Sequence, residues 1–160
     1  MFTILQKSAI ASDLNLNVLR APLLNMYKTL LFSIDSSPGA KKIIQSVLDM
    51  AQLCQSKVVL LSVVEPPESS DPAHPEQTST EAVASLLSQA KQVFEQRGFE
   101  AETIEREGNP AFIICDVADE VAADLIVMGC RGIGLTEEGR EESVSTRVIH
   151  LSPCPVLIVP

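Results

Sequence analysis

The sequence predicts an α/β protein whose five-stranded parallel sheet is doubly wound into a three-layer α/β/α sandwich. Short apolar runs alternate with longer segments whose apolar residues recur at helical spacing, in the order βαβαβαβαβ. The chain is 46% hydrophobic but only 4% aromatic, with no Trp, so Val, Ile, Leu and Ala must build the core. Parallel strands that are buried on both faces have this composition. A length of 160 residues suits one domain with a sizeable core.

Five segments have the features of strands. Four are short apolar runs, which are typical of strands covered on both faces. The third, Phe99–Glu107, alternates polar and apolar residues, so we expect it at an exposed edge of the sheet. The expected strands cover residues 28–35, 57–64, 99–107, 124–128 and 154–159.

Four helices are expected between these strands. Gly98 is the predicted stop of the second helix, and Asn109 and Pro110 are the predicted cap and first residue of the third. Residues 65–80 contain four prolines with serine and acidic residues, which predicts a loop. The expected helices cover residues 40–54, 80–97, 110–123 and 143–151.

Charge and apolar patterning exclude several partners. The formal net charge is -9 and the pI is about 4.6, so we expect no binding to nucleic acid. No apolar run has the length that crosses a membrane, and residues 1–25 lack the pattern of a secretory signal. We interpret residues 1–25 as an N-terminal extension, either disordered or upstream of a true start at Met26.

The four cysteines match no zinc or C-x-x-C spacing. Cys54, Cys115 and Cys154 lie in apolar surroundings and are expected to be small buried residues. Cys130 lies in a loop beside Arg131, where either an unreactive thiol or a redox role is open. All four fit a reducing cytoplasm.

A glycine-bearing loop follows the fourth expected strand. Gly129 and Gly132 would let backbone amides approach an anion, and Ser143 begins a helix whose free N–H groups favour negative charge. The alternative is a plain tight turn with Ser143 as an ordinary helix cap. Asp35 ends the first strand, and it either binds ribose or a metal, or caps the next helix. Asp35 and Gly129 would meet at the switch point if the first and fourth strands are neighbours.

The sequence offers little for a catalytic site. There are only two histidines, at positions 74 and 150, and the latter is most simply a partner of a helix C-terminus. The chain has no nucleophile elbow, no Walker A sequence and no G-x-G-x-x-G. We therefore expect no efficient enzyme, and at most a slow ATPase.

Residues 26–160 resemble the universal stress protein (UspA-like) family from end to end. The opening strand MYKTLLFSID, the fourth strand and turn DLIVMGCRG, and the closing SVSTRVIHLSPCPVLIVP carry the resemblance. The resemblance implies a universal stress protein domain of flavodoxin-like, adenine-nucleotide alpha-hydrolase-like fold, located in the cytoplasm. It also implies a homodimer formed through the terminal strand 154–159, which is apolar and carries no charge.

Nucleotide-binding members of this family carry G-x2-G-x9-G-[S/T]. Gly129 and Gly132 match the first two positions and Ser143 the last, but Glu142 replaces the third glycine. The resemblance implies that Asp35 and Val63 contact ribose and adenine. It also implies that ribose and phosphates are lined by Gly129, Arg131, Gly132, Ser143, Val144 and Ser145.

Two functions follow from this departure. The first is a stress-response regulator that binds ATP or another adenine nucleotide, with or without Mg²⁺, and does not turn it over efficiently. The second is a homodimeric interaction module that binds no nucleotide, because Glu142 crowds and repels phosphate by up to roughly 4 kcal/mol. Glu142 either places its own carboxylate in the anion position or points to water from a surface loop.

Overall fold

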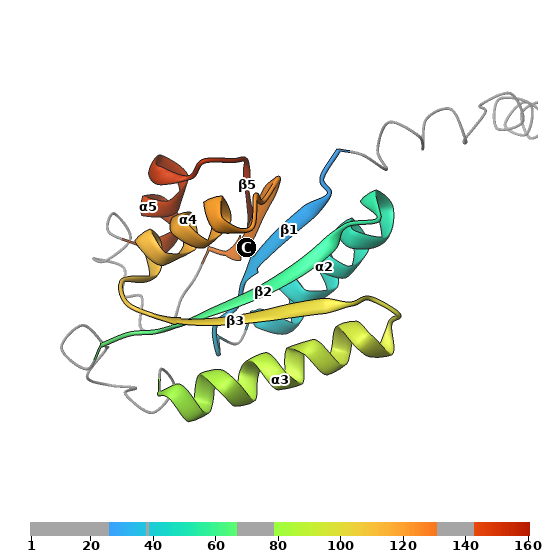
Figure 1. The fold of residues 1–160 in the computed structure, drawn as a ribbon, viewed down its shortest axis with the longest axis horizontal. Coiled ribbons are helices and arrows are strands. Elements are labelled where there is room, and N and C mark those ends of the chain that lie inside the picture. Colours follow the sequence, from blue (N-terminus) through green and yellow to red (C-terminus); the bar gives the residue numbers. More distant parts are fainter. Residues whose placement is uncertain (1–25, 38, 67–78, 131–142) are drawn as a thin grey trace, which may run out of the picture.

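A parallel sheet with strand order β3-β2-β1-β4-β5 forms the centre of the protein (Figure 1). The computed structural model describes residues 26–37, 39–66, 79–130 and 143–160. The strands are β1 (Thr29–Ser33), β2 (Lys57–Val64), β3 (Ala101–Glu107), β4 (Leu125–Gly129) and β5 (Val156–Val159). All four strand pairings of this sheet are parallel, and β1 lies beside β4, which confirms the predicted sheet and its switch point.

Helices cover both faces of the sheet. They are α2 (Ala40–Cys54), α3 (Thr80–Gln96), α4 (Pro110–Glu120) and α5 (Val144–Leu151). Helices α2 and α3 pack on one face, and α4 and α5 pack on the other (Figure 1). The predicted three-layer sandwich is therefore confirmed, and α2 and β2 have the predicted bounds.

Two aliphatic clusters fill the space between the layers. Successive residues of β1 point to opposite faces, so Leu30 and Phe32 join the α2/α3 cluster whereas Leu31 joins the α4/α5 cluster. All three side chains are fully buried. Covering both faces explains why this strand reads as a continuous apolar run instead of an alternating one.

Backbone angles shift several predicted ends. Gly98 has a φ of 81° and ends α3 as predicted, but Phe99 still donates to the Phe94 carbonyl, so β3 begins only at Ala101. Helix α4 ends at Glu120 rather than at residue 123, because Ala122 adopts a left-handed φ of 49°. Asn109 occupies the N-cap position of α4 with an extended backbone, but its side chain makes no capping hydrogen bond.

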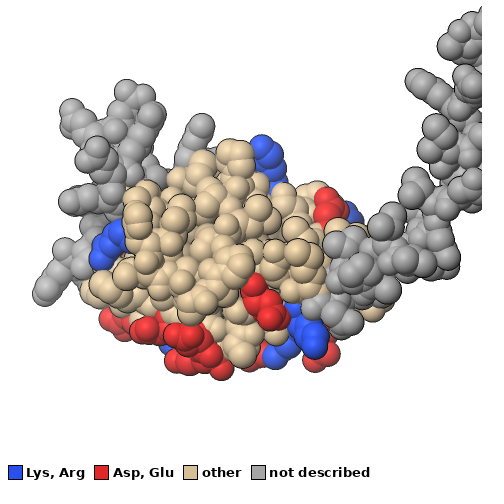
Figure 2. Space-filling model, turned by 90° about the horizontal axis from the view of Figure 1, so that it is seen from above, with Lys and Arg blue, Asp and Glu red and all other residues tan. Residues whose placement is uncertain are grey.

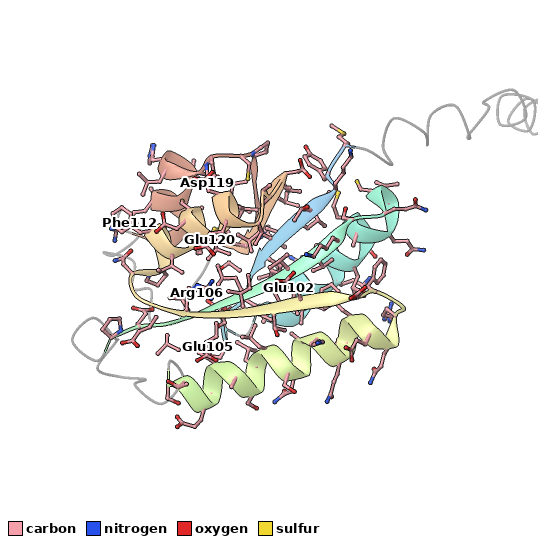
Figure 3. All side chains as sticks on the ribbon, viewed as in Figure 1. Glu102, Glu105, Arg106, Phe112, Asp119 and Glu120 are labelled. Carbon is pink, nitrogen blue, oxygen red and sulfur yellow. The ribbon has the colours of Figure 1, made fainter. Side chains whose placement is uncertain are left out.

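The two edge strands differ in charge. Strand β3 has four charged residues among its seven, which confirms the expected exposed edge. Figure 3 shows Glu102, Glu105 and Arg106 along β3, and Arg106 reaches Glu120 of α4 at 3.2 Å. Strand β5 at the other edge consists of VLIV, without a charge.

Acidic side chains gather along one side of the molecule (Figure 2). Such a surface disfavours phosphate backbones, in agreement with the negative net charge. Within the described ranges, no helix combines the length and the apolar character needed to cross a bilayer.

Candidate functional site

The carboxyl ends of β1, β2 and β4 form one edge of the sheet. Ser33 pairs with Leu61 of β2, and Phe32 pairs with Val127 of β4. Asp35 lies two residues beyond Ser33, Val63 two residues beyond Leu61, and Gly129 two residues beyond Val127. Three of the residues predicted to bind nucleotide therefore project from three adjacent strands at the same edge.

Asp35 organises the turn that follows β1. Its Oδ1 accepts a hydrogen bond from the Ser37 amide at 3.1 Å, in a local turn of the kind that Asp favours. The residue at the N-cap of α2 is Gly39, which makes no side-chain capping bond. The alternative prediction, that Asp35 caps this helix, is therefore wrong.

Ser37 lies in the same turn and was not singled out from the sequence. The residue is 7% exposed, and its hydroxyl is the one buried side-chain polar atom without a partner among the residues that the structure describes. The pair Ser36-Ser37 reads as an ordinary polar turn, so no sequence signal separates this serine from its neighbour.

The first turn of α5 carries three hydroxyls close together. The Ser143 Oγ accepts from the Thr146 amide at 3.2 Å and lies 3.1 Å from the Ser145 Oγ and 2.9 Å from the Thr146 Oγ1. Ser143 is thus the helix cap, as one of the two interpretations expected. The other first-turn amides have no partner within the helix and remain suited to an anion.

Two of the predicted site residues are apolar, one in β2 and one in α5. Val63 of β2 and Val144 of α5 are half-buried, and both pack against the cluster that contains Met128 of β4. Val63 and Val144 thus both lie on the α4/α5 side of the sheet. A flat aromatic ring such as adenine suits a surface of this kind.

Part of the predicted site lies outside the described residues, namely Arg131, Gly132 and Glu142. Gly129 ends β4 opposite Val159 of β5, and the amide of the next residue, Cys130, donates to the Val159 carbonyl at 3.2 Å. The loop therefore leaves the sheet from a fixed position between β1 and β5.

All four cysteines are free. Cys54 and Cys115 are buried as expected, but Cys154 is only half-buried, because it lies in the turn that precedes β5. Burial raises the pKa of the Cys115 thiol, and the carboxylate of Asp116 raises it further. Burial also raises the pKa of the Cys154 thiol, against the opposing hydrogen bond with Ser152. A raised pKa makes a thiol less reactive near neutral pH.

A cavity of about 900 Å³ lies at the opposite edge of the sheet, where β2 and β3 begin. Gln55, Ser56 and Lys57 line one side, and Phe99 and Glu100 line another. Lys57 of β2 and Glu102 of β3 also line the cavity and form an ion pair at 2.6 Å. None of the predicted site residues that the structure describes lines the cavity, so these residues and the cavity are separate.

The sequence matches the family model described as the universal stress protein family over residues 26–160. Among known proteins, it is 58% identical to the universal stress protein Sll1654 of Synechocystis sp. over 137 residues, or 84% of this chain and 87% of that protein. It is 32% identical to the universal stress protein YxiE of Bacillus subtilis, over 84% of this chain and 99% of that protein.

A solved structure of a universal stress protein in complex with cAMP has the same fold. The TM-score is 0.68 at 25% sequence identity, and the likeness covers 85% of this chain and 99% of that chain.

Proposed function

Since the chain belongs to the universal stress protein family, we propose that it binds ATP or another adenine nucleotide and acts as a stress-response regulator. The ligand would lie at the carboxyl ends of β1, β2 and β4. The observation that carries the proposal is that Asp35, Val63 and Gly129 lie at the carboxyl ends of three adjacent strands, with Val144 of α5 packed against the same cluster as Val63. The cAMP complex of a structural neighbour supports this class of ligand.

The described residues fit such a ligand in three respects. Asp35 supplies a carboxylate that accepts hydrogen bonds from ribose hydroxyls. Val63 and Val144 supply an apolar surface for the base. Ser143 and Ser145 place hydroxyls and first-turn amides where phosphate binds favourably. Arg131 and Gly132 would complete the phosphate contacts, as the family motif implies.

Mg²⁺ would accompany the phosphates rather than occupy a protein site of its own. The part of the chain that the structure describes contains no group of three His, Cys, Asp or Glu residues that could hold a metal ion. We propose a binding protein without efficient turnover, and at most a weak ATPase, located in the cytoplasm. Four free cysteines support a reducing compartment.

We further propose a homodimer in which β5 of one copy pairs with β5 of the other. The support is the contrast between the edges. Glu102, Glu105 and Glu107 charge the β3 edge, whereas β5 is wholly apolar and has β4 on one side only. An unprotected apolar edge favours pairing with a second strand.

The second candidate function is an interaction module that binds no nucleotide and works through its dimer. Glu142 in place of the third motif glycine favours this alternative, because a side chain and a negative charge would stand where phosphate approaches.

One experiment separates the two candidates. Protein purified without added nucleotide is denatured, the released small molecules are identified by mass spectrometry, and the emptied protein is titrated with ATP, AMP and GTP by calorimetry. Release or binding of an adenine nucleotide, with weaker binding of GTP, supports the proposed regulator. The absence of both release and binding, in protein that melts cooperatively, would leave only the interaction module.

A further inference from the structure

We infer that the Ser37 hydroxyl is a further nucleotide-positioning group, which bonds a ribose hydroxyl of the ligand beside Asp35. The inference rests on the proposed nucleotide-binding function. Ser37 lies outside the glycine motif, and no sequence pattern assigns it a role.

The first step is that both backbone polar groups of Ser37 already have hydrogen-bond partners. Its amide donates to Asp35 Oδ1 at 3.1 Å, and its carbonyl accepts from the Ala40 amide at 3.1 Å. The hydroxyl alone has no partner, although the residue is only 7% exposed. Buried hydroxyls are nearly always hydrogen-bonded, so one that is not points to a partner that binds from outside the chain.

The second step concerns the turn in which Ser37 lies. The N-cap of helix α2, two residues later, is Gly39, which offers no side-chain oxygen. The hydroxyl of Ser37 does not serve as the cap either, because it makes no hydrogen bond. The unpaired hydroxyl therefore lies in a polar turn at the carboxyl end of β1, where the amides of Ala40 and Lys42 already donate to the carbonyls of Ser37 and Gly39.

The third step is the chemistry of the partner. Asp35 is held against Ser37 by a direct hydrogen bond, and its carboxylate disfavours phosphate but accepts from ribose hydroxyls. A serine hydroxyl both donates and accepts, as a ribose hydroxyl does. Asp35 and Ser37 together would form hydrogen bonds with the ribose hydroxyls, while phosphate would bind after Gly129 and at the start of α5.

The test is the substitution Ser37→Ala, measured in the full chain. Without nucleotide, the variant should melt at least as high as wild type, by a gain of up to about 4 °C, because an unpaired buried hydroxyl is removed. With ATP, it should bind roughly 2- to 10-fold more weakly, because one hydrogen bond to the ligand is lost. A purely structural serine would lower both quantities together.

The ligand itself supplies a second comparison. The loss caused by Ser37→Ala should be smaller for 2′-deoxy-ATP or for 3′-deoxy-ATP than for ATP, because one of these lacks the hydroxyl that Ser37 contacts. Ser56→Ala is the matched control. Ser56 is also a buried serine, but its hydroxyl donates to the Tyr27 carbonyl at the far edge of the sheet, so this variant should melt lower and keep its ATP affinity.

Three results would overturn the inference. One is equal ATP affinity of wild type and Ser37→Ala, and another is an equal loss for ATP and both deoxy analogues. The third is a lower melting temperature of the empty variant, which would mean that the hydroxyl already has a partner such as a buried water. A wild type that binds no nucleotide would instead remove the proposed function, and this inference with it.

Discussion

Asp124 and Thr29 are joined by two hydrogen bonds that run in opposite directions. The Thr29 amide donates to Asp124 Oδ2 at 2.9 Å, and the Asp124 amide donates to the Thr29 carbonyl at 2.9 Å. The same Oδ2 also accepts from the Lys28 amide at 2.8 Å. One carboxylate therefore fixes the starts of β1 and β4, whose far ends flank the candidate site.

Replacing Asp124 with Ala should destabilise the protein by about 1–3 kcal/mol, because two backbone amides lose a charged acceptor. Urea denaturation at neutral pH measures the change. Asp119→Ala is the control, since Asp119 is exposed on α4 and should shift the midpoint little. Equal midpoints for the two variants would contradict the role given to Asp124.

Replacing Glu142 with Gly should raise ATP affinity by about tenfold or more, since it restores the third motif glycine and removes a repulsive charge. Calorimetric titration measures the change. Glu137→Gly in the same loop should give a smaller gain, because it removes a charge without restoring the motif. Unchanged affinity in Glu142→Gly would show that Glu142 points away from the ligand.

Placing a charge on the free edge of β5 should separate the proposed dimer. Ile158→Lys is expected to yield monomers at micromolar concentration, by light scattering after size exclusion, with a cooperative melt that shows the fold is kept. Thr103→Lys, on the already charged β3 edge, should leave the dimer intact. A wild type that is itself monomeric at this concentration would refute the proposed assembly.

Stability should fall at alkaline pH because of Cys115 and Cys154. The pKa of each thiol is raised in the folded protein, so above the ordinary thiol pKa of about 8.5 the unfolded chain loses protons that the folded chain retains. The stabilisation is complete below that pKa and declines as pH rises through the folded value. Urea midpoints between pH 7.5 and 9.5 should decline less steeply for the Cys115→Ala, Cys154→Ala double variant. Parallel curves for the double variant and wild type would count against this account.

Much of the fold could be predicted because its signals are local and repeated. Helix α2 and strand β2 have the predicted bounds, since a helical apolar face and an uninterrupted apolar run leave little ambiguity. The ends of α4 and β3 were misplaced, because they depend on the left-handed backbone at Ala122 and on the turn at Gly98 and Phe99.

The candidate site also has parts that the sequence predicts and one part that it does not. Parallel strands place Asp35 and Gly129 at one edge, as predicted for the case in which the first and fourth strands are neighbours, and the strand order meets this condition. The capping bond of Ser143 also follows a local rule. The unpaired hydroxyl of Ser37 could not be predicted, because its burial depends on the packing of the whole turn against the sheet.

In the proposed dimer, the unequal edges of the sheet would also limit further assembly. When β5 pairs with β5 of a second copy about a two-fold axis, both apolar edges are covered in one contact. The two β3 edges that remain exposed are acidic, so they repel further copies. Assembly would therefore stop at a closed pair instead of extending into a fibre, even when a cell accumulates the protein to high concentration.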